Sequence, residues 1–253
     1  MKKNINLTSL SLLMAVSIIL LSFSFLNNKK HKKIAPAPEA FAVIELFTSE
    51  GCSSCPSADA AIAKLLNKNI KDVYILSYHV DYWNRLGWKD VFSDAKFSER
   101  QQDYASHLSL DGVYTPQVVV NGTTQFVGSD EEALNNSVKN IAKDGSSSNL
   151  SIKAERKDNT AIINYNISGN ESVLLNTAIV LPEADTKVKR GENGGRTLHH
   201  VNIVSTLNVA ELKGTGEFII KIPSQLTGKP IKIIAFTQSK QTFKVVGADE
   251  VDL

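Results

Sequence analysis

The chain has 253 residues and a formal net charge of +2, and 42% of its residues are hydrophobic and 21% charged. This balance is that of a globular protein with enough apolar mass for one large domain or two small ones. The lysines are scattered, without a basic stripe that carries interleaved aromatic residues, so the composition argues against a nucleic-acid partner.

The N-terminal segment has the pattern of an export signal. A cationic start at residues 1–3 precedes an apolar, uncharged run at residues 7–26, which as a helix is about long enough to span a bilayer. Lysines after this run favour the opposite orientation under the positive-inside rule, but the order of cationic and apolar regions is that of a signal. We therefore assign residues 1–33 to a signal peptide or membrane anchor. We expect the rest of the chain to be exported, either periplasmic or anchored and facing the periplasmic or extracellular side.

The following hundred residues alternate between strand and helix patterns. Compact apolar runs are typical of buried strands, apolar residues on one side indicate helices, and Asn121-Gly122 is favoured in two-residue hairpin turns. The expected elements are a strand at 42–47, a helix at 57–66, a strand at 73–80, a helical segment at 92–108, a hairpin at 117–127 and a helix at 130–142.

The pattern changes after a break of flexible composition at residues 144–149. Short strand patterns then alternate with turn residues, which is typical of a small all-β sandwich. The expected strands are at 150–154, 161–167, 173–181, 201–207, 217–222 and 231–237. We therefore expect two domains, an α/β domain at 40–143 and a β-rich domain at 149–253.

The two cysteines, Cys52 and Cys55, lie three positions apart between the first strand pattern and the first helix pattern. A disulfide with this spacing closes almost no loop and adds little stability, so the pair indicates chemistry rather than a structural staple. In the first turn of a helix, backbone N–H groups and the helix dipole favour a thiolate, and residues three apart share a face. We assign Cys52 as the nucleophile and Cys55, one turn further in, as the resolving thiol.

A second motif, Thr115-Pro116, precedes the predicted hairpin. A cis bond at Pro116 would place the Thr115 backbone beside the sulfurs, where it can pair with an extended substrate strand. A trans proline that opens an ordinary strand is the alternative, but the cysteine pair, the hairpin and the final helix together favour the cis form.

These features resemble the thioredoxin superfamily. More narrowly, residues 44–56, 78–83, 87–90, 114–122 and 190–198 resemble one bacterial family of secreted thioredoxin-like proteins of unknown function (DUF1223-like). The resemblance covers essentially all of the chain beyond the N-terminal segment. It implies export and a thioredoxin-like α/β domain, with a central mixed sheet flanked by helices and a helical insert, followed by a small all-β sandwich-like domain. It supplies no substrate. Unlike thioredoxin, the chain has Gly51 before the first cysteine and Ser-Ser between the cysteines, so the direction of redox transfer stays open.

Three acidic or basic residues are auxiliary candidates. His79 and Asp81 alternate along the second strand pattern and are expected on one face, near the cysteine turn. His79 would stabilise a thiolate or move its proton; alternatively, it is a hydrogen-bonded histidine that holds the following loop. Glu45 is a lone acid in the first strand pattern. If buried it would serve as a base for Cys55, and at a strand edge it would merely be solvated.

A charged, glycine-rich turn at residues 190–196 has two interpretations as well. It either reaches over the cysteine pair and helps to choose substrates, or it is a mobile hairpin tip. Likewise, Trp83 and Trp88 either form a wall beside the sulfurs or simply cover the core.

Together these residues predict a thiol–disulfide oxidoreductase that acts outside the cytoplasm. Its partners would be a protein or small-molecule thiol or disulfide and a redox partner that recycles the cysteine pair; no cofactor and no metal are expected. Two alternatives remain, a Cu(I) chaperone that uses the two thiolates and a non-catalytic binding module on a thioredoxin scaffold.

Overall fold

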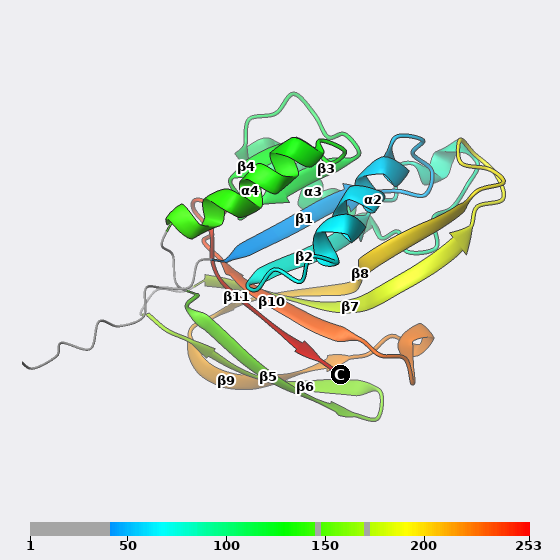
Figure 1. Ribbon diagram of the computed structural model, residues 1–253. Coiled ribbons are helices and arrows are strands. Elements are labelled where there is room, and N and C mark those ends of the chain that lie inside the picture. The colour runs from blue at the N-terminus through cyan, green and yellow to red at the C-terminus, as the bar shows by residue number, and fades with distance from the viewer. Residues whose placement is uncertain (1–40, 145–147, 170–172) are drawn as a thin grey trace, which may run out of the picture. The chain divides into compact units, whose positions relative to one another are not determined.

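The protein is described by a computed structural model of residues 41–144, 148–169 and 173–253, and these residues form one compact unit. An eight-stranded mixed sheet runs through this unit, in the order β11-β10-β7-β8-β2-β1-β3-β4, and β5, β6 and β9 form a second sheet (Figure 1). The predicted signal or anchor at residues 1–33 lies outside the described residues. Within the described part of the chain, every helix is too short or too polar to cross a membrane.

The first half of the chain follows the predicted order of elements. They are β1 (Ala42–Thr48), α2 (Cys55–Leu66), β2 (Val73–His79), the short 3-10 helix η1 (Asn84–Leu86), α3 (Ala95–His107), β3 (Gln117–Val120), β4 (Thr124–Val127) and α4 (Glu131–Asp144). Strand β1 is parallel to β2 and antiparallel to β3, which is antiparallel to β4. Helix α3 begins later than the predicted segment because Asp94 caps it, accepting a hydrogen bond of 2.9 Å from the Lys96 N–H.

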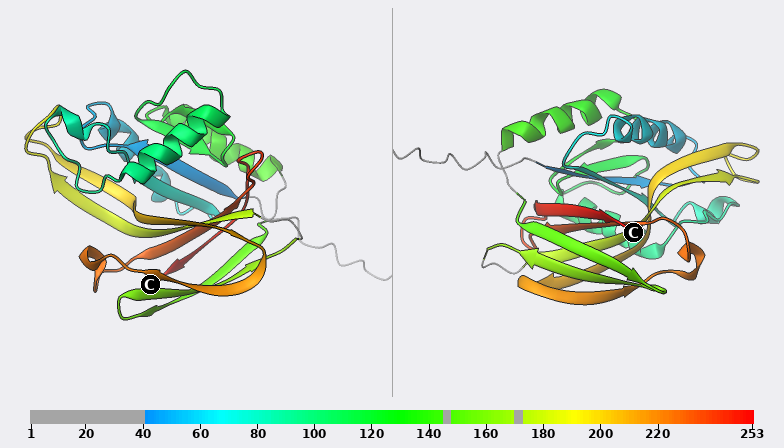
Figure 2. Two further views of the ribbon diagram at one scale, coloured as in Figure 1. Left: turned by 180° about the vertical axis from the view of Figure 1, so that it is seen from behind. Right: turned by 60° about the horizontal axis from the view of Figure 1, so that its bottom comes forward.

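The helices cover both faces of this part of the sheet. Ile62 of α2 and Leu134 of α4 pack against Ile44 on one face, whereas Phe97 and Tyr104 of α3 pack on the opposite face. Figure 2 shows α3 from behind, on the far side of the sheet from α2. Because every residue of β1 is buried, the strand lies between two layers of helix and carries a site at its end without exposing its flanks.

The second half contributes strands to both sheets. They are β5 (Leu150–Lys157), β6 (Thr160–Ile167), β7 (Val173–Lys187), β8 (Thr197–Leu212), β9 (Gly214–Lys221), β10 (Lys232–Gln238) and β11 (Val245–Asp252), with the 3-10 helix η2 (Ser224–Leu226) between β9 and β10. Apolar side chains from β5, β6 and β9 pack on those of β7, β10 and β11 in a second core. This layering is sandwich-like, but one of its layers is an extension of the central sheet.

The arrangement corrects the expected two-domain division at residues 40–143 and 149–253. Strand β8 pairs in parallel with β2 at Ser77 and Ile203, so one sheet crosses the predicted boundary. Side chains strengthen this short junction, since the Ser77 hydroxyl donates to the Val201 carbonyl at 2.8 Å and the Asn202 amide donates to the Ile75 carbonyl at 3.1 Å. The break in composition near residue 145 therefore separates two sequence patterns rather than two independent sheets.

The Asn121-Gly122 turn between β3 and β4 forms as predicted. Both residues have positive φ angles, of 47° and 73°, which Asn and Gly adopt more readily than other residues. Thr123 follows them, and Val120 pairs with Thr124 across the hairpin. The Asn121 side-chain oxygen accepts a hydrogen bond of 2.8 Å from the Val43 N–H, and its carbonyl accepts one of 3.0 Å from the Val245 N–H. A β-carbon at Gly122 would overlap the Phe243 carbonyl oxygen, so this turn is fitted closely against the C-terminal strands.

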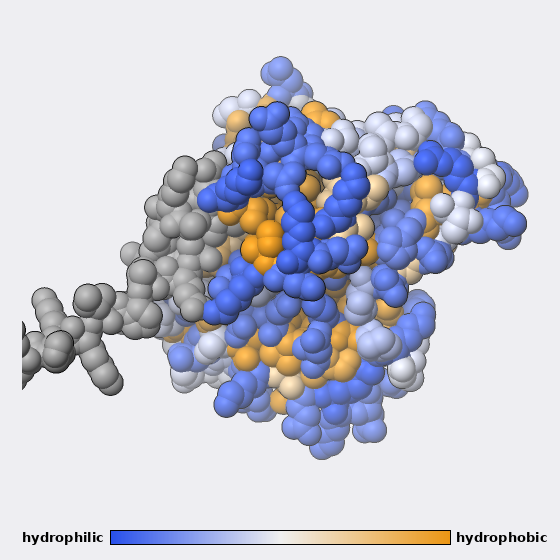
Figure 3. Space-filling view, viewed as in Figure 1, coloured by the Kyte–Doolittle hydropathy of each residue, from blue (hydrophilic) through white to orange (hydrophobic). Residues whose placement is uncertain are grey.

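Among the described residues, the exposed large hydrophobic side chains are spread over the chain. On the side shown in Figure 3, hydrophilic residues dominate and hydrophobic residues show in several places between them. The exposed large hydrophobic side chains come from several different elements: Ile70, Leu86, Val91, Val127, Val209 and Ile219. The cysteine pair is therefore the stronger candidate for a functional site.

Candidate functional site

The two cysteines lie where the sequence places them and form a disulfide. Cys55 is the first residue of α2, and Cys52 is in the turn between β1 and α2. The Cys55 N–H donates to the Cys52 carbonyl at 3.2 Å, and Pro56, which lacks an N–H, occupies the first helical turn. Both cysteines are fully buried, although Ser53 and Ser54 between them are exposed.

The Thr115-Pro116 bond is cis, and the structure brings it to the disulfide. The Thr115 carbonyl oxygen lies 3.9 Å from Cys52 Sγ. The Trp83 indole N–H donates to the Thr115 hydroxyl at 2.8 Å, and Trp83 also packs against the hydrophobic core, as one of its two interpretations expected. A β-carbon at Gly51 would lie 3.1 Å from the Trp83 Cβ, which explains why glycine occupies the position before the first cysteine.

A hairpin tip at residues 188–196, between β7 and β8, covers the cysteine turn. The buried Asn193 side-chain amide donates to the Glu50 carbonyl and to the Cys52 carbonyl, at 2.9 Å each. The exposed Glu192 carboxylate accepts a hydrogen bond of 3.0 Å from the Ser53 N–H, and hydrogen bonds from Ser53 lower the pKa of Glu192. Of the two interpretations of this segment, the structure supports the one in which it reaches over the cysteine pair.

A buried polar cluster lies next to the cysteine turn, and its first half is a histidine–aspartate pair. His79 Nδ1 lies 2.7 Å from an Asp90 carboxylate oxygen, which also accepts a hydrogen bond of 2.8 Å from the Glu50 N–H. Burial on its own would lower the pKa of His79, but the charge and hydrogen bond of Asp90, aided by Asp59 and Glu50, raise it overall. Burial would raise the pKa of Asp90, but His79 and two backbone N–H groups lower it.

The second half of the cluster is a similar pair. His200 Nδ1 lies 3.1 Å from one Asp59 carboxylate oxygen, and the Thr48 hydroxyl donates to the other at 3.0 Å. The two histidine rings are 4.7 Å apart in an edge-to-face arrangement. The Trp88 indole N–H donates to one Glu50 carboxylate oxygen at 2.7 Å, and the other lies 3.8 Å from His200 Nε2.

Three buried atoms of this cluster make no hydrogen bond within the described part of the chain: Glu50 Oε1, His79 Nε2 and His200 Nε2. Nevertheless, among residues 41–144, 148–169 and 173–253 no group of three or more histidine, cysteine or acidic side chains is placed to hold a metal ion. The cluster is a buried set of two histidines and three acidic residues beside the residues that precede Cys52.

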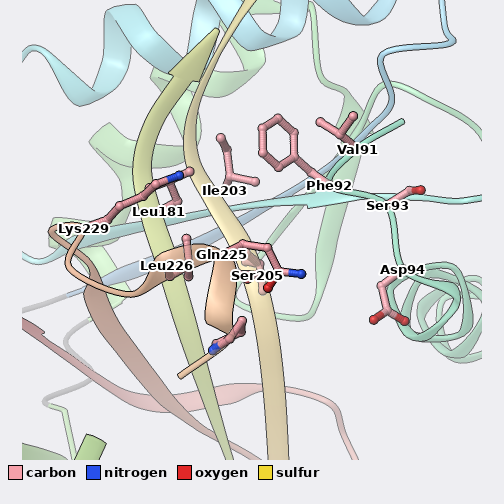
Figure 4. A pocket seen from close by; sticks show the side chains of 12 residues that line it. Val91, Phe92, Ser93, Asp94, Leu181, Ile203, Ser205, Gln225, Leu226 and Lys229 are labelled. Carbon is pink, nitrogen blue, oxygen red and sulfur yellow. The ribbon is translucent and has the colours of Figure 1, made fainter. Parts of the chain in front are cut away.

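Phe92 separates this cluster from a pocket of about 440 Å³. Its ring lies 5.3 Å from that of His79 and 5.9 Å from that of His200, and its other side faces the pocket. Figure 4 shows Phe92 beside Ile203 on one wall, with Lys229 and Leu226 from the region of η2 nearby. The cysteines do not line this pocket, so it is a neighbour of the disulfide site rather than part of it.

The structure contradicts the expectation that Glu45 is a base for Cys55. Glu45 points to the α3 face of the sheet, where its carboxylate accepts hydrogen bonds of 2.5 Å and 3.0 Å from the Arg100 guanidinium. The Tyr104 hydroxyl also donates to it, at 2.5 Å. Since α2 lies on the opposite face, Glu45 is the buried partner of an ion pair and not part of the cysteine site.

His79 and Asp81 do not share a face, because β2 ends at His79. The Asp81 carboxylate accepts a hydrogen bond of 2.5 Å from the Ser98 hydroxyl of α3, whereas His79 lies on the side of His200 and α2. Asp90, which His79 contacts, belongs to the loop after β2, and the His79 carbonyl accepts a hydrogen bond of 3.2 Å from the Asp94 N–H. His79 therefore fits the alternative of a histidine that holds the following loop.

Sequence reasoning missed several residues around the site. Asp59 follows Cys55 by four positions, so helical spacing alone would have placed it on the same face. Asn193 lies within the glycine-rich turn and is its one buried residue between positions 189 and 197. For Glu50, Asp90 and His200 the sequence carries no local signal, because the cluster forms from three separate segments.

Comparisons with known proteins agree with the family resemblance. A family model described as "protein of unknown function (DUF1223)" matches residues 43–238. The X-ray crystal structure of a protein from Agrobacterium tumefaciens is similar to this chain, with 30% sequence identity and a TM-score of 0.65, over 85% of this chain and 96% of that one. No curated protein matches this chain.

Proposed function

Because this chain belongs to the DUF1223 family, whose description names no activity, we propose a function from its site: it is a thiol–disulfide oxidoreductase that acts outside the cytoplasm. The observation that carries the proposal is the disulfide at the start of α2, with the Thr115 carbonyl 3.9 Å from Cys52 Sγ. A three-residue disulfide constrains the unfolded chain very little, so stability alone does not account for it.

The order and pairing of the elements also support the proposal. A strand, the cysteine pair, a helix, a parallel strand, a cis proline, a hairpin and a final helix are the features that resemble the thioredoxin superfamily. We therefore interpret the part from β1 to α4 as a thioredoxin-like arrangement whose sheet is extended by strands of the second half.

The exchange proceeds in two steps. A thiolate of the partner attacks Cys52 Sγ, the Cys52–Cys55 bond breaks, and Cys55 leaves as a thiolate that takes up a proton. A second thiolate of the partner then attacks the partner sulfur that is bonded to Cys52, and Cys52 leaves as a thiolate. Two electrons pass from the partner dithiol to the protein, and the reverse sequence oxidises a dithiol.

The proposal includes export of the protein from the cytoplasm. The cationic start and apolar run at residues 1–33 have the order of a signal or anchor, and a disulfide persists in oxidising compartments outside the cytoplasm. The partners are then a thiol or disulfide of a protein or small molecule and a redox protein that recycles the cysteine pair.

A titration with glutathione tests the proposal on protein that lacks residues 1–33. We expect a reversible two-electron transition, and a Cys55→Ser variant that traps a mixed disulfide through Cys52. A potential near thioredoxin's value of about −270 mV would indicate a reductant, and one near about −120 mV an oxidant. If no transition occurs and no mixed disulfide forms, the proposal is wrong. Stoichiometric Cu(I) binding that is lost when either cysteine is replaced would then favour the metal-chaperone alternative.

A further inference from the structure

We propose that the hairpin tip at residues 188–196 imitates a bound peptide, and that the substrates of this site are extended polypeptides that carry a cysteine rather than small thiols. This inference rests on the proposed exchange activity and names its substrate class. It starts from the chemical groups that the tip presents to the cysteine turn and from the groups that it covers.

The side-chain groups of the tip that contact the cysteine turn supply donors and an acceptor that a peptide main chain also has. The Asn193 carboxamide uses the two hydrogens of its NH2 group to donate to two carbonyl oxygens, those of Glu50 and Cys52. The Glu192 carboxylate accepts from the Ser53 N–H, as a peptide carbonyl would. Two N–H groups and one carbonyl of a peptide chain can therefore replace these contacts when it displaces the tip.

The groups that the tip covers all belong to the main chain. They are two carbonyl oxygens and one N–H, and the Thr115 carbonyl oxygen lies on the sulfur nearby. Glu50 is fully buried, so its carbonyl is costly to leave unpaired, whereas the Cys52 carbonyl keeps its hydrogen bond from the Cys55 N–H and Ser53 is exposed. A thiol without amide groups has no N–H or C=O to offer these groups, whereas an extended peptide carries both along its main chain.

Access to the sulfurs requires a movement, because Cys52 has no exposed surface. The buried Asn193 is hydrogen-bonded to the Cys52 carbonyl oxygen. Gly191 sits against Trp88, because a β-carbon at position 191 would lie 3.3 Å from the Trp88 Cβ. The tip therefore packs on Trp88 and on the main chain of the cysteine turn, and in this proposal its departure opens the way to Cys52 Sγ.

The chemical step is the exchange already described, with a peptide as the thiol. The peptide cysteine attacks Cys52 Sγ as a thiolate, and the Cys52–Cys55 bond breaks as the peptide–Cys52 bond forms. Cys55 leaves with the electron pair and takes up a proton. A second cysteine thiolate of the peptide then completes the transfer, so that a peptide disulfide and the reduced Cys52/Cys55 pair are formed.

The experiment measures second-order rate constants for reduction of the oxidised protein, corrected for the thiolate fraction of each reagent. The reagents are 2-mercaptoethanol, an uncharged pentapeptide with a central cysteine, and the same peptide N-methylated on both residues that flank the cysteine. We expect the unmodified peptide to react at least about tenfold faster than 2-mercaptoethanol. N-methylation, which removes N–H donors and leaves the thiol in place, should abolish that advantage.

Variants of the tip test the imitation itself. Asn193→Ala removes two hydrogen bonds that hold the tip, so it should raise the rate with 2-mercaptoethanol by about tenfold or more. Asn208→Ala, on an exposed part of β8, is the matched control and should leave the rate unchanged. Glu192→Gln keeps the length of an exposed side chain and weakens one hydrogen bond to the cysteine turn, so it should raise the same rate by a smaller factor. This variant keeps the test available if Asn193→Ala does not fold.

The outcomes separate this inference from the activity on which it rests. If dithiothreitol fails to reduce the disulfide reversibly, the exchange activity is wrong. If dithiothreitol reduces it reversibly but 2-mercaptoethanol and both peptides react at one rate, the polypeptide substrate is wrong. If the unmodified peptide is preferred but neither tip variant changes any rate, the tip does not compete with the peptide and the imitation is wrong.

Discussion

The buried ion pair between Glu45 and Arg100 allows a direct test of how this fold is stabilised. The substitution Glu45→Gln keeps the size and shape of the side chain and removes its charge. The guanidinium of Arg100 then stays in place without its compensating carboxylate, under the aromatic rings of Tyr78 and Tyr104. Because Arg100 cannot lose its proton to relieve the imbalance, the charge stays buried.

The size of the effect follows from burial and geometry. The Glu45 side chain is 1% exposed and that of Arg100 is 12% exposed, and the pair makes two hydrogen bonds. Breaking a buried pair by removing one partner costs about 3–5 kcal/mol, whereas a domain of this kind has a total stability of about 5–15 kcal/mol. We therefore expect Glu45→Gln to lower the free energy of unfolding by about 3–5 kcal/mol.

Denaturation by urea, followed by circular dichroism on the oxidised protein, measures this change. A Glu45→Met, Arg100→Met double variant is the control, since it replaces both charges by apolar groups and should be less destabilised than Glu45→Gln. The same proteins are assayed for reduction by dithiothreitol, and we expect the rate for Glu45→Gln to equal that of the wild type wherever the variant is folded.

Two results would refute this reasoning. A loss below about 1 kcal/mol would mean that water reaches the pair and screens it. A folded Glu45→Gln protein that exchanges disulfides much more slowly would restore Glu45 as a base for Cys55, in spite of its position on the opposite face of the sheet.

Three further predictions concern the rest of the fold. Folding raises the pKa of His79, so the contribution of His79 to stability is complete below about pH 6.5 and is lost as the pH rises through the folded-state pKa. Folding lowers the pKa of Asp90, so the contribution of Asp90 is present above about pH 4 and is lost on acidification. The free energy of unfolding should therefore decline from pH 6 toward pH 9, and Asp90→Asn should flatten that decline; an unchanged slope in the variant would contradict the assignment. Asp59→Ala removes the hydrogen-bond partner of the Thr48 hydroxyl and of His200 Nδ1. It should lower the free energy of unfolding, measured by urea denaturation, by about 1–3 kcal/mol for each of these two buried groups. If no loss is measured, the cluster is solvated. Gly122→Ala should lower the melting temperature far more than Gly87→Ala, because both glycines have positive φ but only at Gly122 does the new methyl group meet backbone; equal losses would mean that the turn relaxes freely.

Local chemistry made part of this structure predictable. The cysteine spacing, the Asn121-Gly122 turn and the apolar period of α2 depend on neighbours in the chain, and all three appear as expected. Strand β8 was predicted at 201–207 but extends over Thr197–Leu212, because its ends are partly exposed and lack the apolar run that marks a buried strand.

What depends on distant pairing could not be predicted. In β1 all residues are buried, so the alternation that would assign Glu45 to one face is absent from the sequence. The contact of β8 with β2 joins residues more than a hundred positions apart, and the change of composition near residue 145 suggested a boundary instead. The polar cluster was hidden for the same reason, since Glu50, Asp90 and His200 come together only in the folded chain.

The parallel contact between β2 and β8 has a consequence for dissecting this protein. A fragment that ends near residue 144 would leave β2 as a bare outer strand, with the Ser77 hydroxyl and the Ile75 carbonyl deprived of their partners. Unprotected outer strands recruit other chains, so such a fragment would associate with itself instead of reporting on the chemistry of the cysteines. It would also lack Asn193 and Glu192, and any reactivity that it retained would be that of an uncovered disulfide. Transplanting the cysteine segment into another scaffold would therefore transfer its sulfurs without the hydrogen bonds that Asn193 and Glu192 make to the cysteine turn.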